Sequence, residues 1–416
     1  MKSARPAAGW VYLAAFVAIG MSLQLLGPSL TYLRERSGSS KGEIAVLFIA
    51  SSSGYLLGAL SSGRLYDRGF GHRALAGGLL GIALAMLLLP QMSSRSGLCV
   101  VFAIVGASTG LVDVGGNTLV VWHSRGRGSN QLLNALHQCF GVGALIVPVL
   151  VNRSLAWAHS LAISSAAIAT YATVVAMIVL LHAVPVDAPR PEVREADAET
   201  PRRVLAVIGA FFFLYVGVEI GFSGWLKTYA EGIHLPGANA STYINTLFFA
   251  TFTLGRLLAV LLAKRVRAGV MLVGSCALTA ACLVAMIVAN GSPGGVWVTT
   301  GLIGLTMAPQ YATMVAYAEH NISLSGRATS WFVSSSALGG LALPYLIGQL
   351  LDGSSRAMPV AVLVAAVACT AWVAVVRKTL VRARAGSAGS GGVQVGGGLA
   401  AAVDGEDRAT DVARQG

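Results

Sequence analysis

The amino-acid sequence predicts an all-α membrane protein with twelve transmembrane helices in two pseudo-symmetric six-helix halves. Of its 416 residues, 55% are hydrophobic and only 11% are charged, whereas a soluble domain carries about 25% charged residues. Long apolar runs recur along the chain, and the second half of the sequence repeats features of the first. A bilayer is the solvent in which so apolar a chain can bury its surface.

Twelve apolar runs have roughly the 20 residues that a membrane-spanning helix needs. The stretch 268–318 contains no Asp, Glu, Lys or Arg. It must break near Pro293, because a proline among paired glycines ends a helix. The predicted spans are 10–33, 44–66, 74–92, 97–122, 130–152, 157–182, 204–230, 240–262, 268–290, 295–318, 328–350 and 357–378.

The distribution of Lys and Arg predicts the orientation. Counted over loops and helix ends, nineteen lie on the side of the two termini and seven on the other. Basic residues favour the cytoplasmic side, so we expect both termini in the cytoplasm and a multi-pass protein of the cell membrane, the inner membrane if bacterial. The first run is too long for a cleavable signal peptide. The net charge of +12 therefore reflects topology and not nucleic-acid binding.

The polar, proline-rich segment 183–203 predicts a linker between two halves. We expect an N-terminal six-helix half at 1–182, a cytoplasmic linker at 183–203, a C-terminal six-helix half at 204–380 and a disordered cytoplasmic tail at 381–416, whose Gly and Ala content is typical of flexible chains.

Shifts of 194 to 200 residues superpose features of the two halves, which predicts an internal repeat. Parallel repeats of this kind place a solute site at mid-membrane between the halves. The matched pairs include Gly20 with Gly217, Gly27 with Gly224, Gly143 with Gly339, and Pro148 with Pro344.

The loop after the second span reads Gly63-Arg64-Leu65-Tyr66-Asp67-Arg68-Gly69-Phe70-Gly71-His72-Arg73. It resembles the signature loop of the major facilitator superfamily, a G-x-L-x-D-R stretch followed by a further Gly and basic residues. The resemblance implies a cytoplasmic gate that latches the two halves together. A carboxylate there can cap a helix or pair with Arg. The implied gating residues are Gly63, Asp67, Arg68 and Arg73.

Further motifs resemble the fucose-permease and sodium-dependent glucose transporter branch of that superfamily. They are Gly27-Pro28-Ser29-Leu30, Gly54-Tyr55-Leu56-Leu57-Gly58, Asp113-Val114-Gly115-Gly116-Asn117-Thr118, Ala135-Leu136-His137 with Phe140-Gly141-Val142-Gly143-Ala144, and Tyr215-Val216-Gly217-Val218-Glu219 with Trp225. The resemblance implies secondary active or facilitative transport of a small polar solute, a sugar, by alternating access. It also implies a proton site on the fourth-span acid.

Asp113 and Glu219 are the two acids deep within predicted spans, and we expect them to couple transport to an ion. An intramembrane carboxylate is costly and normally faces a polar cavity. Burial would let Asp113 carry a proton near neutral pH, while the amide oxygen of Asn117 beside it would equally suit sodium. The fucose permease has an acid in its first span where this chain has Gln24. That departure puts a two-acid mechanism of the same kind in doubt.

Amide and imidazole groups can both donate to and accept from sugar hydroxyls. Asn134, His137 and Gln138 share one helix face, since they are spaced i, i+3 and i+4. The predicted solute-binding residues are Gln24, Asn117, Asn134, His137, Gln138, Asn245, Gln310 and Trp331.

The alternative function is a drug or metabolite efflux carrier of the same superfamily. Exporters carry an Arg in the fourth span and a G-x-x-x-G-P-x-x-G-G run in the fifth, and this chain has neither. No catalytic constellation predicts an enzyme, and the five cysteines predict no disulfide framework and no metal site. We expect no cofactor and a monomer whose partners are the solute, a proton or sodium ion and the lipid bilayer.

Overall fold

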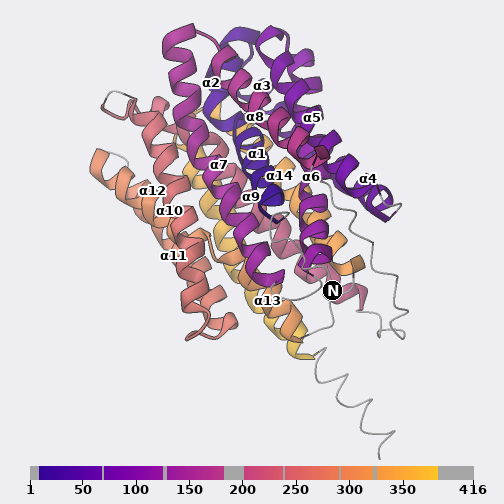
Figure 1. Cartoon of the computed structure of the whole chain (residues 1–416). Coiled ribbons are helices and arrows are strands. Elements are labelled where there is room, and N and C mark those ends of the chain that lie inside the picture. The colour runs from indigo at the N-terminus through magenta and orange to yellow at the C-terminus, as the bar shows by residue number, and fades with distance from the viewer. Residues whose placement is uncertain are drawn as a thin grey trace, which may run out of the picture.

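The computed structural model describes residues 9–67, 70–124, 129–181, 201–237, 239–289, 292–321 and 326–382. These residues are helical apart from short connections (Figure 1). The N-terminal half contains α1 (Gly9–Leu23), α2 (Leu26–Ser37), α3 (Lys41–Ile44), α4 (Val46–Asp67), α5 (Gly71–Leu88), the 3-10 helix η2 (Leu89–Gln91), α6 (Arg95–Ser124), α7 (Ser129–Ala158) and α8 (Ala162–Leu181).

The C-terminal half contains α9 (Arg202–Gly232), α10 (Ala240–Leu262), α11 (Ala268–Val288), α12 (Pro293–Met307), α13 (Gln310–Asn321), α14 (Gly326–Leu351) and a last helix over Ala357–Arg382. The predicted linker and tail lie almost wholly outside the described residues.

Within the described ranges, eleven helices are long and apolar enough to cross a membrane. The predicted span 295–318 is present in two pieces, α12 and α13. Pro309 lies between them and has no N–H to donate to the carbonyl four residues earlier, so the helix is interrupted there. A similar interruption separates α1 from α2 at Gln24, whose carbonyl would have bonded to the nitrogen of Pro28 in a regular helix. These two breaks divide the predicted spans 10–33 and 295–318 into two pieces each.

The glycines of the internal repeat lie at equivalent positions in the two halves. A Cβ on Gly20 or Gly143 would collide with the backbone of the facing helix in the α1–α7 pair. In the same way, Gly339 of α14 lies against the backbone of α9, where Gly217 faces it. Small residues let membrane helices approach closely. The repeat read from the sequence is therefore a repeat of helix packing.

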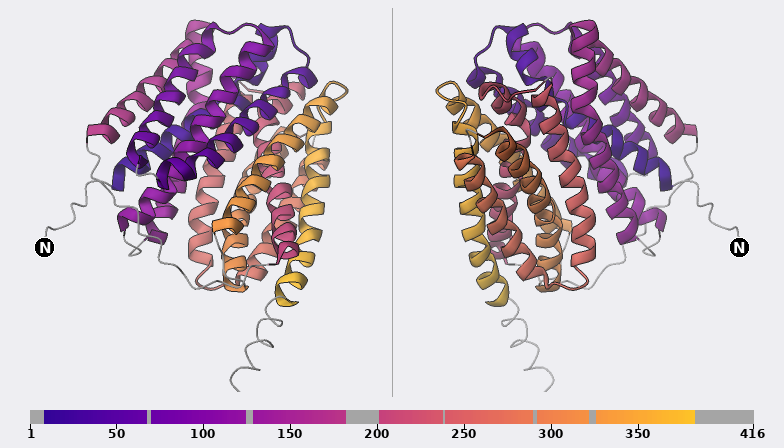
Figure 2. Two further views of the ribbon diagram at one scale, coloured as in Figure 1. Left: turned by 90° about the vertical axis from the view of Figure 1, so that its right-hand side faces the viewer. Right: turned by 90° about the vertical axis from the view of Figure 1, so that its left-hand side faces the viewer.

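The two halves meet where α4 packs against α14 and α7 packs against α10. Figure 2 shows them converging at the end that carries α3 and the turn after α14, and diverging toward the other end. We call the first of these the closed end; it holds residues 34–43, 89–95 and 351–356. Gly27 and Gly224, a matched pair of the repeat, also meet across the halves, since a Cβ on Gly27 would lie 3.1 Å from the Gly224 Cα.

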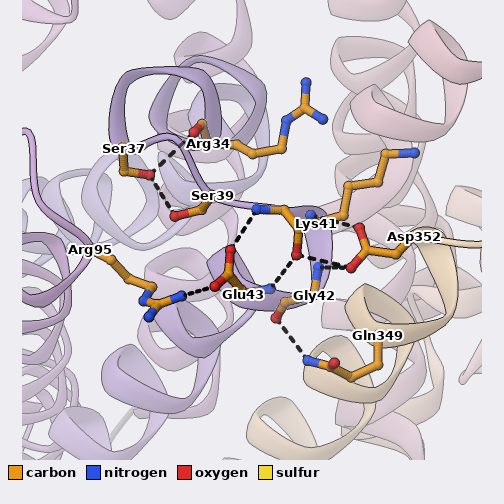
Figure 3. Close-up of polar contacts among 10 residues, drawn as sticks. Arg34, Ser37, Ser39, Lys41, Gly42, Glu43, Arg95, Gln349 and Asp352 are labelled. Carbon is orange, nitrogen blue, oxygen red and sulfur yellow. Dashed lines mark hydrogen bonds and ion pairs between the residues drawn. The ribbon is translucent and has the colours of Figure 1, made fainter.

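A polar cluster joins the halves at the closed end (Figure 3). The carboxylate of Asp352, in the turn after α14, accepts hydrogen bonds from the backbone N–H groups of Lys41 at 2.9 Å and Gly42 at 3.0 Å, and from the Ser40 hydroxyl at 3.0 Å. The side-chain amide of Gln349 donates to the Gly42 carbonyl at 2.8 Å. We call these five residues the latch.

The N-terminal side of the latch is held in shape within its own half. Ser40 and Glu43 form a capping box, in which the Ser40 N–H donates to the Glu43 carboxylate at 2.9 Å and the Glu43 N–H donates to the Ser40 hydroxyl at 3.1 Å. Arg95 at the start of α6 pairs with Glu43 at 2.7 Å. Because these contacts fix the start of α3, the backbone N–H groups of Lys41 and Gly42 point at Asp352 without any further ordering of the chain.

A second set of contacts joins α2 to α9 one layer below the latch. The Thr31 hydroxyl donates to the Glu231 carboxylate at 2.6 Å. The buried Lys227 ammonium donates to the Pro28 carbonyl at 2.7 Å and lies 3.8 Å from Glu231. The closed end is thus sealed by two successive layers of polar contacts.

The charge distribution predicts that the closed end faces the outside of the cell. A cysteine introduced at the exposed Ser93 should react with an impermeant maleimide added outside intact cells, and a cysteine at the exposed Arg265 should react only after the membrane is opened. Both variants would be made in a background without the five native cysteines. Labelling of Arg265→Cys in intact cells would reverse the predicted orientation.

Candidate functional site

Asp113 lies on α6 near its middle and is hydrogen-bonded through both carboxylate oxygens. The Tyr55 hydroxyl of α4 donates to Oδ2 at 2.5 Å, and the Asn117 amide, one turn further along α6, donates to Oδ1 at 3.0 Å. The close α4–α6 approach that makes the tyrosine contact possible depends on Gly54 and Gly58, where a Cβ would meet the α6 backbone. The geometry therefore holds an intramembrane acid between two groups that can each either donate or accept.

Glu219 lies near the middle of α9 in the other half. Its carboxyl is hydrogen-bonded to the hydroxyl of Tyr215, one turn earlier on the same helix, and interacts electrostatically with Arg256 of α10. The arginine is not in direct contact, since no ion pair within 4.0 Å of Glu219 occurs among the described residues. Each half thus contributes one mid-membrane acid with its own tyrosine.

The side chain of Arg256, on α10 of the C-terminal half, reaches α7 of the N-terminal half. One of its guanidinium nitrogens donates to the His137 backbone carbonyl of α7 at 3.1 Å. The guanidinium carbon also lies 4.7 Å from the ring centroid of Phe252 and 5.8 Å from that of Phe140, which belong to opposite halves. These are cation–π distances. The guanidinium charge of Arg256, which acts on Glu219 from a distance, is therefore held at the seam between α7 and α10.

The face of α7 that carries the predicted solute-binding residues Asn134, His137 and Gln138 is accessible. Asn134 and His137 have exposed side chains and Gln138 is half-buried, although all three belong to a helix that packs against α1, α8 and α10. The His137 ring makes an edge contact with Phe16 of α1 at 5.8 Å between centroids. The side-chain oxygen of Gln138 is buried and has no hydrogen-bond partner within the described structure. This face can offer hydrogen bonds to a polar solute.

The other predicted solute-binding residues fall into two groups. Gln24, at the break between α1 and α2, and Asn117 are half-buried, and Trp331 is 50% exposed. Asn245 and Gln310 are buried inside the C-terminal half.

The amides of these two buried residues are bound by their own half. The Asn245 amide nitrogen donates to the Ser223 carbonyl at 3.2 Å. That of Gln310 donates to the Thr279 hydroxyl at 2.8 Å and the Ser275 carbonyl at 3.3 Å. The structure does not bring these two residues to the accessible face of α7.

The predicted gate is described only in part. Arg68 lies outside the described residues, and Gly63 and Asp67 are placed in the last turn of α4 without a described side chain. Arg73 is exposed near the start of α5. Gly63, Asp67 and Arg73 belong to the end opposite the latch. The gating role of all four residues stays a prediction.

Three residues that sequence reasoning did not single out belong to this region: Arg256, Tyr55 and Tyr311. Arg256 had a readable signal, since it is an arginine in the middle of the apolar run 240–262, and intramembrane charges mark functional sites. Tyr55 stood in the Gly54–Gly58 motif without a role of its own, and Tyr311 had no signal, because tyrosine is common in membrane helices. Tyr311 is half-buried on α13 and interacts electrostatically with both acids.

Comparison with known proteins gives consistent matches over most of the chain. The sequence model of the Major Facilitator Superfamily matches residues 12–344. The sodium-dependent glucose transporter 1A of Mus musculus is 27% identical over 398 residues, which cover 83% of this chain and 90% of that protein.

Two solved structures share the fold. A bacterial homolog of the human lysosomal transporter Spinster, in an inward-facing and occupied conformation, superposes with a TM-score of 0.74 at 12% identity and covers 92% of this chain and 99% of its own. The E. coli fucose:proton symporter FucP superposes with a TM-score of 0.63 at 18% identity and covers 91% of this chain and 99% of its own.

Proposed function

We propose, from the premise that this chain belongs to the Major Facilitator Superfamily, that it carries a sugar across the membrane together with a proton or a sodium ion. The match over residues 12–344 confirms the superfamily predicted from the signature loop, and with it a multi-pass membrane transporter and not an enzyme. The relative named sodium-dependent glucose transporter 1A supports a sugar as the solute and an ion as the co-substrate.

The observation that carries the proposal is the pair of mid-membrane acids. Asp113 belongs to the N-terminal half and Glu219 to the C-terminal half, and each is held by hydrogen bonds instead of a direct ion pair. Carboxyls placed so deep are costly and are retained where an ion is bound and released. The accessible amides and imidazole of α7 lie at the same seam, and such groups suit a neutral solute rich in hydroxyls.

The conformation is consistent with transport by alternating access. The latch and the α2–α9 contacts close one end, and the halves diverge toward the other (Figure 2). If the closed end faces outward, as the basic residues favour, the structure is the inward-facing state. The carrier would then reach its outward-facing state by parting the latch while the halves rock about the α4–α14 and α7–α10 contacts.

Counterflow in proteoliposomes tests the proposal. Vesicles loaded with one unlabelled sugar would be diluted into the same sugar in labelled form, over a panel that includes glucose and fucose. Transient uptake of label by protein-containing vesicles, and not by empty ones, is the expected result. Imposing a proton gradient or a sodium gradient then identifies the coupling ion by the accumulation it drives. Absence of counterflow for every sugar in the panel would remove sugars as the solute.

A further inference from the structure

Arg256 is an intramembrane arginine whose hydrogen-bonding capacity is mostly unused by the protein. A guanidinium carries five N–H donors, and this one donates to the His137 carbonyl of α7 at 3.1 Å. Among the described residues it donates to no other acceptor, and no carboxylate lies within 4.0 Å of it. An arginine retained within an apolar span is costly and marks a functional site.

Two aromatic rings hold the guanidinium without using its donors. Phe252 precedes Arg256 by one turn of α10, and its ring centroid lies 4.7 Å from the guanidinium carbon. The Phe140 ring of α7 lies 5.8 Å from the same carbon. Aromatic rings stack on the flat face of a guanidinium, whereas its N–H groups point outward within its own plane. The edge of the group therefore stays available to oxygen atoms.

Close packing of α7 against α10 brings the arginine to this position. A Cβ on Gly141 of α7 would lie 2.5 Å from the Thr253 hydroxyl oxygen of α10, so a glycine is needed at this approach. His137 precedes Gly141 by one turn of α7, and Arg256 follows Thr253 by about one turn of α10. The absent side chain of Gly141 thus leaves the His137 carbonyl within reach of the guanidinium.

The unused donors lie beside the accessible face of α7. The carbonyl that holds Arg256 belongs to His137, whose side chain is exposed on that face, and Arg256 itself is half-buried. The buried side-chain oxygen of Gln138, the next residue, has no hydrogen-bond partner within the described structure and can accept from a hydroxyl. Arg256 and this face belong to opposite halves, so a solute held between them contacts both halves, as alternating access requires.

We propose that Arg256 binds the solute directly, with the free edge of its guanidinium donating to two adjacent hydroxyl oxygens of a sugar held between α7 and α10. The inference rests on the proposed function and names the feature of the sugar that is recognised, a pair of hydroxyls on neighbouring carbons. The planar fork of N–H donors matches two neighbouring oxygens. A carboxylate would match it too, but Asp113 and Glu219 disfavour an anionic solute, because like charges repel.

The side chain is ordered before the sugar arrives. The rings of Phe140 and Phe252 and the His137 carbonyl fix its position in the structure without a solute. Such preorganisation reduces the entropy that binding costs. Lysine cannot replace arginine here, since an ammonium is a compact point charge with neither a flat face for the rings nor a fork for two oxygens.

Monodeoxy analogues test the contact. Counterflow of labelled glucose or fucose, whichever is transported, would be inhibited by the same sugar and by each of its monodeoxy analogues. Arg256→Gln should weaken inhibition by the parent sugar about tenfold or more, the effect of losing hydrogen bonds from a charged donor. Analogues without either hydroxyl of the pair are already weak in the wild type, and the substitution should weaken them much less. The two positions so identified should lie on neighbouring carbons.

Arg153→Gln is the matched control, because Arg153 is an exposed arginine 5.9 Å from the centroid of another ring, that of Trp157, near the other end of α7. It should leave every inhibition constant unchanged. Arg256→Lys should behave like Arg256→Gln and provides a second variant. Ratios between analogues do not depend on the amount of active protein, so they stay valid for a variant of low yield.

Two results would overturn the contact. Arg256→Gln could weaken the parent sugar and all analogues equally, which is the behaviour of a residue that only shapes the seam, or it could weaken none. Stronger inhibition by glucuronate than by glucose would overturn the assignment to a pair of hydroxyls. Wild-type vesicles without counterflow for any sugar would instead refute the proposed function itself.

Discussion

Asp113→Asn is expected to abolish accumulation of the solute against a gradient while exchange of solute across the membrane continues. Asparagine has the shape and neutrality of the protonated acid and can still receive the Tyr55 hydroxyl, which lies 2.5 Å from the carboxylate in the wild type. A site that can no longer lose its proton cannot tie solute movement to a net flow of ions. Exchange needs no net ion flow, so the inside-to-outside ratio should fall to unity with exchange retained.

Uphill uptake and equilibrium exchange would be measured side by side in the same vesicles. Glu319→Gln is the matched control, because it removes an exposed carboxylate near the end of α13 and should leave both activities unchanged. Asp113→Asn vesicles that still concentrate solute would remove this acid from the coupling role. Loss of exchange together with accumulation would show instead that Asp113 is needed for solute binding or folding.

The fold could be predicted because its determinants are local and repeated. A run of apolar residues specifies a membrane helix whatever its neighbours are, and the glycine pairs of the repeat mark helix contacts that recur in both halves. Gly20 and Gly217 were matched by sequence spacing, and both lie at close helix contacts in the structure. The breaks at Gln24 and Pro309 follow from the missing N–H groups of Pro28 and Pro309. Of these two prolines, only Pro28 belongs to a motif described in the sequence analysis.

The site could be predicted only where a residue is anomalous in its own helix. An acid in an apolar run is anomalous, so Asp113 and Glu219 were found. Whether an amide faces the seam or its own bundle depends on the rotation of its helix, which sequence spacing does not fix within a mostly apolar span. Gln310 accordingly bonds to α11 inside its half. The sequence could not predict the latch, because its acceptor, Asp352, lies about three hundred residues along the chain from the N–H groups that it binds.

Asp352→Asn is expected to shift the population from the closed toward the parted form of the latch. The neutral amide keeps the shape but loses the charge that favours the N–H groups of α3, and a charge at an exposed helix N-terminus is worth about 0.3–1 kcal/mol. That corresponds to about a twofold to fivefold change in the ratio of the two forms. Exchange should quicken if opening of the closed end limits it, and slow if reclosure does.

Double electron–electron resonance between spin labels at Ser93 and Pro236 measures the distance between the two halves at the closed end. Both residues are exposed at the closed end, and they belong to opposite halves. Glu35→Gln is the control, since it removes an exposed carboxylate at the same end that pairs with its neighbour Arg34 in its own half. Identical distance distributions for Asp352→Asn and wild type would show that the latch does not hold the halves.

The pH dependence of the latch gives the sharper test. Burial raises the pKa of the Asp352 carboxyl, but hydrogen bonds, first from the Gly42 N–H and then from the Ser40 hydroxyl, outweigh it and hold the pKa below its ordinary value. In the parted form the carboxyl titrates near its ordinary value of about 3.9. The carboxylate therefore stabilises the closed form fully above that pH, and this stabilisation is lost as the pH falls through the lowered pKa of the closed form.

The difference between wild type and Asp352→Asn should accordingly be constant from about pH 8 to about pH 5 and vanish only in stronger acid, where the wild-type carboxyl is also neutral. Mid-membrane acids affect both proteins alike, so subtracting the two profiles isolates the latch. A difference that already disappears between about pH 7 and about pH 5 would mean that the hydrogen bonds from α3 do not favour the ionised form. Asp352 would then be a neutral contact at the closed end, and the α2–α9 layer, with the buried Lys227, would have to hold the halves together.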